Sequence, residues 1–289
     1  MFRNPKCRLT IEAAALTDVG RVRSQNQDAF LIDPQIRLYA VADGMGGHRA
    51  GEVASAMVVD ALQRYFRESR SETLLSSGAS TEDQTLSEPA NRVQAAVHHA
   101  NRAVFEASRA DEKCRGMGST IAAVWFDSGT AIAANVGDSP IFLLHDGAIE
   151  RLSVPHTVEE EERHRNPEIS ESPDHPFRHM LTRGMGVDPV VDADICEVQC
   201  FSGDRMVLCS DGLSNHVSPE EILDIVVSAP AESACAHLLN LANERGGEDN
   251  ITVMILTVVG PPTLAGGWMA RLDHVRKWVN CRLNGIGAS

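Results

Sequence analysis

Aspartates at the ends of short apolar segments are the feature that most limits how this chain can fold. Asp43, Asp138 and Asp211 each end such a segment, and Asp249 lies just before another. One Asp-Gly pair by itself is usually an ordinary turn, as we expect at Asp146-Gly147. Four carboxylates at strand ends, each beside Gly or Asn, are harder to explain as separate turns. Buried carboxylates repel one another, so cations are expected to neutralise them.

The donor atoms indicate which cations would fit. The four aspartates offer only oxygen, and oxygen donors without a Cys or His set favour hard cations such as Mg²⁺ or Mn²⁺. Two such ions about 3.5–4 Å apart can activate a water and polarise a phosphoryl oxygen. Arg23 adds a planar guanidinium that can bind phosphate through two hydrogen bonds. The residues alone therefore favour metal-assisted hydrolysis of a phosphate ester, with unrelated turns as the alternative.

Hydrophobic periodicity predicts a mixture of strands and helices. Strands are expected at 9–16, 29–32, 36–42, 121–126, 130–136, 141–144, 149–152, 193–200, 205–209 and 251–259. Helices are expected at 50–66, 89–110 and 232–244, and one more begins at the capping pattern of 218–221. Residues 69–88 are expected to form an exposed loop. The last expected helix is amphipathic and carries Trp268, Leu272, Val275, Trp278 and Val279.

A polar segment at 155–179 contains His156, His164, His175 and His179 and the run Glu159–Glu162. This composition could imitate a His/Glu metal cluster. A solvated helix and a flexible flap are the better interpretation, because three prolines lie inside the segment.

Composition limits the function classes. The chain has 289 residues, enough for one large domain or two small ones, and a formal net charge of −14. That charge argues against nucleic acid as the main partner, since phosphate backbones need Lys and Arg. No apolar stretch reaches the ~18 residues needed for a membrane span, and we read no signal peptide. The 7 cysteines, an odd number without Cys-x-x-Cys, favour a reducing compartment. We therefore expect a cytoplasmic location and no thiolate zinc site.

Seven motifs resemble, in order and spacing, those of bacterial metal-dependent Ser/Thr phosphatases of the PP2C (PPM) family. They are Thr17-Asp18-Val19-Gly20 with Arg23 and Asn26-Gln27-Asp28, Asp43-Gly44-Met45-Gly46-Gly47-His48, Gly116-Met117-Gly118-Ser119-Thr120, Val136-Gly137-Asp138-Ser139, Leu181-Thr182-Arg183-Gly184-Met185-Gly186, Ser210-Asp211-Gly212-Leu213 and Glu248-Asp249-Asn250. The resemblance implies an α+β fold, a four-layer αββα sandwich in which two antiparallel sheets are flanked by helices. It implies a phosphatase domain over 9–260, followed by a C-terminal amphipathic helix or tail at 261–289.

The resemblance also implies a metal centre with Mn²⁺ or Mg²⁺. Asp43 would bridge two metal ions, and Gly44 would give one of them its backbone carbonyl. Asp211 and Asp249 would complete the shell of the first metal. Asp138 would bind a third, weaker metal.

Three further residues receive roles in catalysis from the same resemblance. Asp28 would hold metal-bound water, and Arg23 would bind the substrate phosphate. His48 would be the general acid for the leaving Ser or Thr oxygen. For His48 the alternative is a histidine at a helix start with no role. The segment 155–179 would be the flap beside the cleft.

Three residues depart from the common family pattern. Gln27 stands where many members have Glu, Pro140 where many have Arg, and Asn215 where many have Asp. A neutral amide at Asn215 should weaken the third metal site, while the two-metal core is intact. The segment Ser210–His216, together with Gly-Asp-Ser-Pro at 137–140, resembles the phosphatases encoded with type VI secretion systems. These oppose a Ser/Thr kinase that acts on an FHA-domain protein.

Several alternatives stay open. One is a folded module that binds phosphoproteins with little or no turnover, although the aspartate cluster shows no damage. Another is a phosphatase for small phosphate esters, or one of a different bacterial signalling pathway. In each case we expect a monomer without a nucleic-acid partner or a membrane span.

Overall fold

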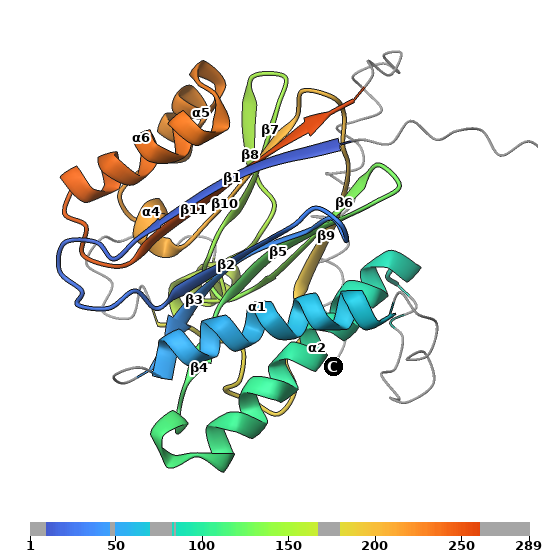
Figure 1. Cartoon of the computed structure of the whole chain (residues 1–289), viewed down its shortest axis with the longest axis vertical. Coiled ribbons are helices and arrows are strands. Elements are labelled where there is room, and N and C mark those ends of the chain that lie inside the picture. Colours follow the sequence, from blue (N-terminus) through green and yellow to red (C-terminus); the bar gives the residue numbers. More distant parts are fainter. Residues whose placement is uncertain (1–9, 47–49, 70–82, 84, 167–179, 261–289) are drawn as a thin grey trace, which may run out of the picture.

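Two antiparallel sheets form the centre of the computed structural model, which describes residues 10–46, 50–69, 83, 85–166 and 180–260 (Figure 1). The first sheet has the order β1-β11-β10-β7-β8, and the second has the order β2-β3-β5-β6-β9, with β4 paired to β3. The first comprises β1 (Thr10–Asp18), β11 (Ile251–Val259), β10 (Arg205–Cys209), β7 (Ile141–His145) and β8 (Ala148–Arg151). The second comprises β2 (Asp28–Asp33), β3 (Leu38–Met45), β4 (Gly118–Ser119), β5 (Ile121–Asp127), β6 (Thr130–Val136) and β9 (Asp194–Gln199).

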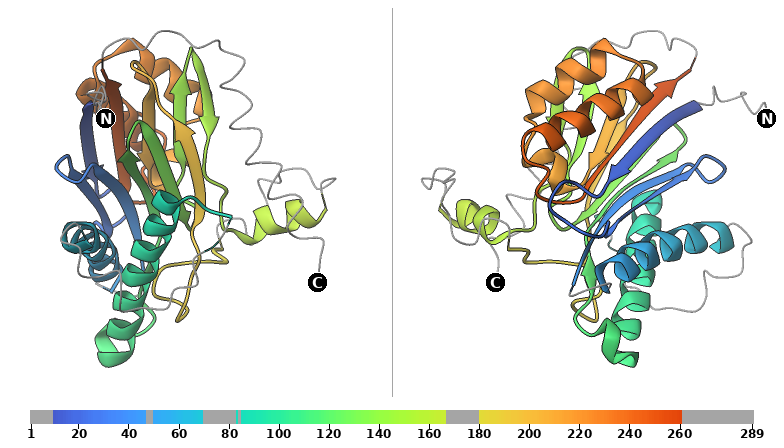
Figure 2. Two further views of the ribbon diagram at one scale, coloured as in Figure 1. Left: turned by 90° about the vertical axis from the view of Figure 1, so that its right-hand side faces the viewer. Right: turned by 60° about the vertical axis from the view of Figure 1, so that its left-hand side comes forward.

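Helices cover the outer face of each sheet, as the two views of Figure 2 show. Long helices α1 (Ala50–Glu68) and α2 (Glu88–Ala110) pack on the second sheet, and α5 (Pro219–Ser228) and α6 (Ala231–Glu244) pack on the first. The remaining described helices are η2 (Glu112–Cys114), α3 (Val158–Arg165) and α4 (Asp211–Ser214). The four layers are therefore helix, sheet, sheet and helix, and the predicted αββα sandwich is confirmed.

Three hydrophobic clusters hold the layers together, one between each neighbouring pair. Strand β3 shows why its sequence is a continuous apolar run. Leu38 and Ala40 face the helices, whereas Tyr39 and Val41 face the other sheet. Successive side chains of a strand point to opposite faces, and here both faces are buried.

One sequence prediction is wrong at Asp43. We expected the strand to end at Ala42, but β3 continues to Met45. Gly44 and Met45 pair with Ser119 and Gly118 of β4, so the chain does not turn there. An Asp-Gly pair is compatible with a strand when a second strand satisfies its backbone groups.

Other expectations hold closely. Ser218 and Glu221 form the capping box that begins α5. Asp146 and Gly147 turn the β7–β8 hairpin, both with positive φ, as a type I′ turn requires. The predicted flap residues 167–179 and the predicted C-terminal helix lie outside the described residues. In the described part of the chain, no helix has the length and apolar character to cross a membrane.

Candidate metal centre

Two carboxylates of the site are neighbours across one strand pair. Asp28 begins β2 and lies directly opposite Asp43 of β3. The other three lie beside strand ends. Asp138 follows β6, Asp211 begins α4 directly after β10, and Asp249 precedes β11. Their mutual repulsion acts on Asp43. Burial first, and then the charges of the other four, raises the pKa of Asp43 well above its usual value.

Thr252 of β11 and Ser210, which directly follows β10, hold Asp28. Its Oδ2 atom accepts hydrogen bonds from the hydroxyls of Thr252, at 2.6 Å, and Ser210, at 2.8 Å. Its Oδ1 atom is buried and has no hydrogen-bond partner. Burial raises the pKa of Asp28 to about 6, although the two hydroxyl groups oppose the shift. One oxygen is therefore fixed, and the other is available to a ligand.

The Gly-Ser-Thr motif before β5 fixes the backbone of Asp43. The Asp43 amide donates to Thr120 Oγ1 at 3.0 Å, and the Asp43 carbonyl accepts from the Thr120 amide at 2.8 Å and from Ser119 Oγ at 2.9 Å. Thr120 Oγ1 in turn lies 2.7 Å from Ser139 Oγ, beside Asp138. The sequence motif thus positions a carboxylate from a neighbouring strand.

Gly44 lies where only a glycine fits. A Cβ atom added to Gly44 would lie 2.1 Å from the carbonyl oxygen of Gly51 and 2.6 Å from that of Gln27. Its amide donates to the same Gln27 oxygen at 3.1 Å. Backbone from two other segments therefore leaves no room for a side chain at this position. His48, in the same motif, lies outside the described residues.

Asp138 and Asp211 also interact with one another and with neighbouring side chains. Burial, followed by the charge of Asp211, raises the pKa of Asp138 to about 7. Arg151 donates to the Asp138 carbonyl at 3.3 Å. Asp211 Oδ2 accepts from Asn215 Nδ2 at 3.2 Å. The departure at Asn215 thus places a neutral amide directly on a carboxylate of the site.

Arg23 and Asp249 contact one another. Arg23 Nη2 lies 2.7 Å from Asp249 Oδ2, and both side chains are partly exposed, at 53% and 36%. Asp249 Oδ1 accepts the amide N–H of Asn250 at 2.8 Å. From the resemblance, we expected Arg23 to bind a phosphate and Asp249 to bind a metal ion. The structure adds that a cation on Asp249 would compete with Arg23.

Asn250 is a residue whose role the sequence did not reveal. Its Nδ2 atom donates to the carbonyls of Val19 and Gln25, both at 2.9 Å, and its Oδ1 atom accepts from the Gln27 amide at 2.8 Å. These partners lie at the two ends of the loop that carries Arg23. The Asn250 side chain therefore attaches both ends of this loop to the segment that precedes β11. The motif Glu-Asp-Asn pointed to this position, but nothing in the sequence indicated which backbone groups it binds.

The donor set fits a hard cation. Five carboxylates converge, burial and mutual repulsion raise the pKa values of Asp28, Asp43 and Asp138, and Asp28 Oδ1 is a buried oxygen without a partner. Among the described residues, no three His, Cys, Asp or Glu side chains lie close enough together to hold an ion in their present conformations. We explain the distances between the carboxylates by their mutual repulsion and by the ion pair between Arg23 and Asp249. A divalent cation would remove the repulsion, and oxygen donors suit Mg²⁺ or Mn²⁺.

Comparison with known sequences agrees with the fold and the site. The family model described as protein phosphatase 2C matches residues 20–253. The serine/threonine phosphatase stp of Listeria monocytogenes is 35% identical over 246 residues, which cover 83% of this chain and 93% of that protein.

Solved structures are similar as well. The catalytic domain of serine threonine protein phosphatase PstP in complex with 2 manganese ions has a TM-score of 0.72 and 31% identity, covering 87% of this chain and 100% of that one. PppA, a key regulatory component of T6SS in Pseudomonas aeruginosa, has a TM-score of 0.70 and 28% identity, covering 86% and 97%. A family match across most of the sequence and a relative above 30% identity together show that the chain belongs to the PP2C family of protein serine/threonine phosphatases.

Proposed function

We propose that this phosphatase removes phosphate from phosphoserine and phosphothreonine of a protein with the help of Mn²⁺ or Mg²⁺. The observation that carries the proposal is the convergence of five carboxylates whose repulsion divalent cations would relieve. The similar PstP domain contains 2 manganese ions, which supports the choice of metal. We assign the metal ligands as Asp43, the Gly44 carbonyl, Asp211 and Asp249, with Asp138 for a weaker third ion.

Each remaining residue receives a specific task. The bound cations would supply an activated water and neutralise charge on the phosphoryl oxygens. Asp28 Oδ1 would accept a hydrogen bond from that water, because Thr252 and Ser210 already hold Oδ2. Arg23 would bind the phosphate, and His48 would protonate the leaving oxygen. Hydrolysis of p-nitrophenyl phosphate tests the proposal: we expect turnover with Mn²⁺, none with EDTA, and none after Asp211→Asn. Equal turnover with EDTA would contradict it.

We further propose a type VI secretion role, a Ser/Thr kinase as the opposing enzyme, and a phosphorylated FHA-domain protein as substrate. The likeness to PppA and the combination of Pro140 with Asn215 support this. The second candidate is a PP2C-type phosphatase of another bacterial signalling pathway, because the identity to stp, 35%, exceeds the 28% identity to PppA. The value of kcat/KM on a phosphorylated type VI FHA-domain protein, against an unrelated phosphothreonine protein, tests it. A ratio near one would favour the second candidate.

The remaining assignments are also proposals. We propose that 9–260 is the phosphatase domain and 261–289 a C-terminal helix or tail, and that the protein is a cytoplasmic monomer. A protease that removes 261–289 without loss of turnover would support the domain limits. Sedimentation of the full chain tests the monomer.

Arg23→Ala is expected to change substrate and metal binding in opposite directions. KM for p-nitrophenyl phosphate should rise about 10–100-fold, because a charged hydrogen bond to phosphate is lost. The dissociation constant of Mn²⁺, measured by calorimetry without substrate, should fall about threefold, since Asp249 loses its competing ion pair. Arg21→Ala removes the same charge from the same loop and is the control. If both variants bind Mn²⁺ equally well, Arg23 does not compete for Asp249.

Metal affinity should depend on pH below about 8. The raised pKa values of Asp28, about 6, and Asp138, about 7, mean that the folded chain holds protons where an unfolded chain has lost them. These protons stabilise the metal-depleted fold below pH ~4, and this contribution is lost as pH rises through 6–7. A cation must displace them. We expect Mn²⁺ affinity to weaken at least about tenfold from pH 7.5 to 6. A flat calorimetric profile over that range would refute the assignment.

A further inference from the structure

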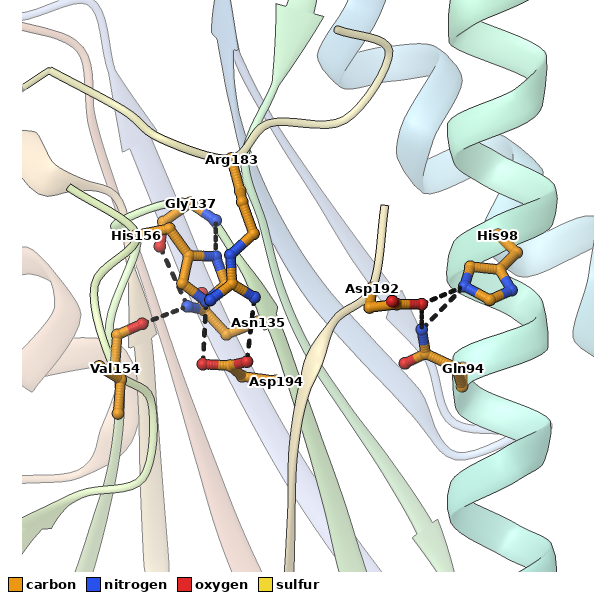
Figure 3. A network of polar contacts seen from close by, with 9 residues as sticks. All are labelled: Gln94, His98, Asn135, Gly137, Val154, His156, Arg183, Asp192 and Asp194. Atoms are coloured by element: carbon orange, nitrogen blue, oxygen red, sulfur yellow. Dashed lines mark hydrogen bonds and ion pairs between the residues drawn. The ribbon is translucent and has the colours of Figure 1, made fainter. Parts of the chain in front are cut away.

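A buried histidine lies beside the loop that carries Asp138. His156 was expected in a solvated segment, and that prediction is wrong: it is only 2% exposed. Figure 3 shows its ring between Gly137 and Asp194. His156 Nδ1 accepts the Gly137 amide N–H at 3.0 Å, so the ring proton is on Nε2. Nε2 lies 2.9 Å from Asp194 Oδ2.

The Gly137 peptide is fixed on both sides by this histidine. Besides the side-chain contact, the His156 amide donates to the Gly137 carbonyl at 2.9 Å, and Asn135 Nδ2 donates to the same oxygen at 3.1 Å. Gly137 has φ of 103°, and a Cβ atom there would lie 2.6 Å from Thr120 Cγ2. These contacts therefore hold the backbone in one conformation at Gly137, the residue directly before Asp138.

A buried carboxylate in turn orients His156. Asp194 lies in β9, and its side chain is 4% exposed. Its second oxygen, Oδ1, accepts from Arg183 Nη1 at 3.2 Å (Figure 3). Arg183 thus offsets the charge of Asp194, and His156 Nδ1 acts as the acceptor for the Gly137 amide. Partners of this kind fix the tautomer and the orientation of a histidine.

We propose that His156 is a positioning residue for Asp138. It fixes the Gly137 peptide and so the direction in which the Asp138 side chain leaves the backbone. The next residue, Ser139, lies 2.7 Å from Thr120 Oγ1, which also accepts the Asp43 amide, so this loop is held beside Asp43. The role rests on the proposed function, because Asp138 matters only if the carboxylate cluster is the active site. His156 itself does not touch the reacting atoms.

Three substitutions separate the contacts of the ring. In His156→Asn, the side-chain amide oxygen lies near the Nδ1 position and can still accept the Gly137 N–H. His156→Gln places its amide near Nε2, and His156→Phe removes both contacts. The matched control is His98→Phe, because His98 pairs with Asp192 at 2.9 Å on the surface, away from Gly137 (Figure 3).

The first measurement needs no metal. In protein treated with EDTA, hydrogen exchange of the Gly137 amide should become faster in His156→Phe and His156→Gln. It should stay slow in His156→Asn and His98→Phe. Melting temperatures of all four variants are recorded alongside. If His156→Phe does not fold, the comparison of the Asn and Gln variants gives the result. Equal protection of Gly137 in these two variants would overturn the proposal.

The second measurement is a double-mutant cycle on kcat/KM. His156→Phe should lower kcat/KM about 10–100-fold, as for other residues that orient a metal ligand, and His156→Asn should recover most of the loss. In an Asp138→Asn background, His156→Phe should cause no further loss. Additive losses would overturn the positioning role. If Asp138→Asn has no effect while Asp43→Asn abolishes turnover, the positioning role fails and the proposed function stands. If neither substitution matters, both fail.

Discussion

Asp43→Asn is expected to lower kcat/KM for p-nitrophenyl phosphate by about 1,000-fold or more. In the proposed function Asp43 would hold both cations, so its loss would weaken the binding of both ions and the activation of water together. Calorimetry on the same variant should show Mn²⁺ affinity falling by at least about tenfold. Retention of Mn²⁺-dependent turnover would contradict the two-metal assignment.

The same substitution should stabilise the fold when metal is removed. Burial, and then the charges of four aspartates, raises the pKa of Asp43 above that of an unfolded chain. A carboxyl group with a raised folded pKa stabilises the fold below its unfolded pKa, and this contribution is lost as pH rises through the folded pKa. At any pH above the unfolded pKa, keeping this carboxyl group buried beside the other four therefore costs stability. Asn removes that charge, and we expect a gain of about 1–3 kcal/mol in EDTA.

A matched control exists at the other end of the same strand pair. Asp33 is 3% exposed, but Gln63 and Arg67 hold its Oδ2 atom at 2.8 and 3.0 Å. Burial acts to raise the pKa of Asp33, and these hydrogen bonds outweigh burial and lower it. Asp33→Asn should therefore destabilise the fold and leave kcat/KM unchanged. Thermal unfolding in EDTA and in Mn²⁺ distinguishes the two aspartates. The expectation fails if both variants move the melting temperature in one direction.

Much of the fold could be predicted because its signals are local. Both faces of the central strands are buried, so they appear as apolar runs, and the helices show a regular apolar stripe. The order of the motifs then indicated the sandwich. The local sequence pattern could not show which distant segment pairs with the backbone of a given strand. Strand β3 continues past Asp43 because β4, about 75 residues later, pairs with Gly44 and Met45.

The residue types of the proposed site could be read from the sequence, but their contacts could not. Asp43, Asp211 and Asp249 could be assigned because each stands in a distinctive motif. Their contacts depend on residues far away in the chain: Arg23 meets Asp249 across 226 positions. His156 was misjudged for the same reason, since its polar neighbours in sequence gave no sign that β9 and the β6–β7 loop bury it.

Asn250→Ala is expected to disorganise the loop that carries Arg23. Asn250 is 4% exposed, and its side chain makes three hydrogen bonds to backbone groups at the two ends of that loop. Alanine would leave two carbonyls and one amide without these partners, at a cost of about 2–4 kcal/mol of unfolding free energy. KM should rise about 10–100-fold because Arg23 loses its fixed position. Urea unfolding and steady-state kinetics measure the two effects.

A second buried asparagine separates the loss of stability from the loss of loop geometry. Asn243 is 6% exposed, lies on α6 and donates to Asp18 Oδ1 at 3.2 Å, just before the loop begins. Asn243→Ala should lower the unfolding free energy by about 1–3 kcal/mol and leave KM near its wild-type value. Under conditions in which both variants are fully folded, only Asn250→Ala should raise KM. Equal KM values for the two variants would mean that the Arg23 loop keeps its shape without the Asn250 side chain. The phosphate site would then depend on the Arg21–Gly247 backbone hydrogen bond instead, at 2.7 Å.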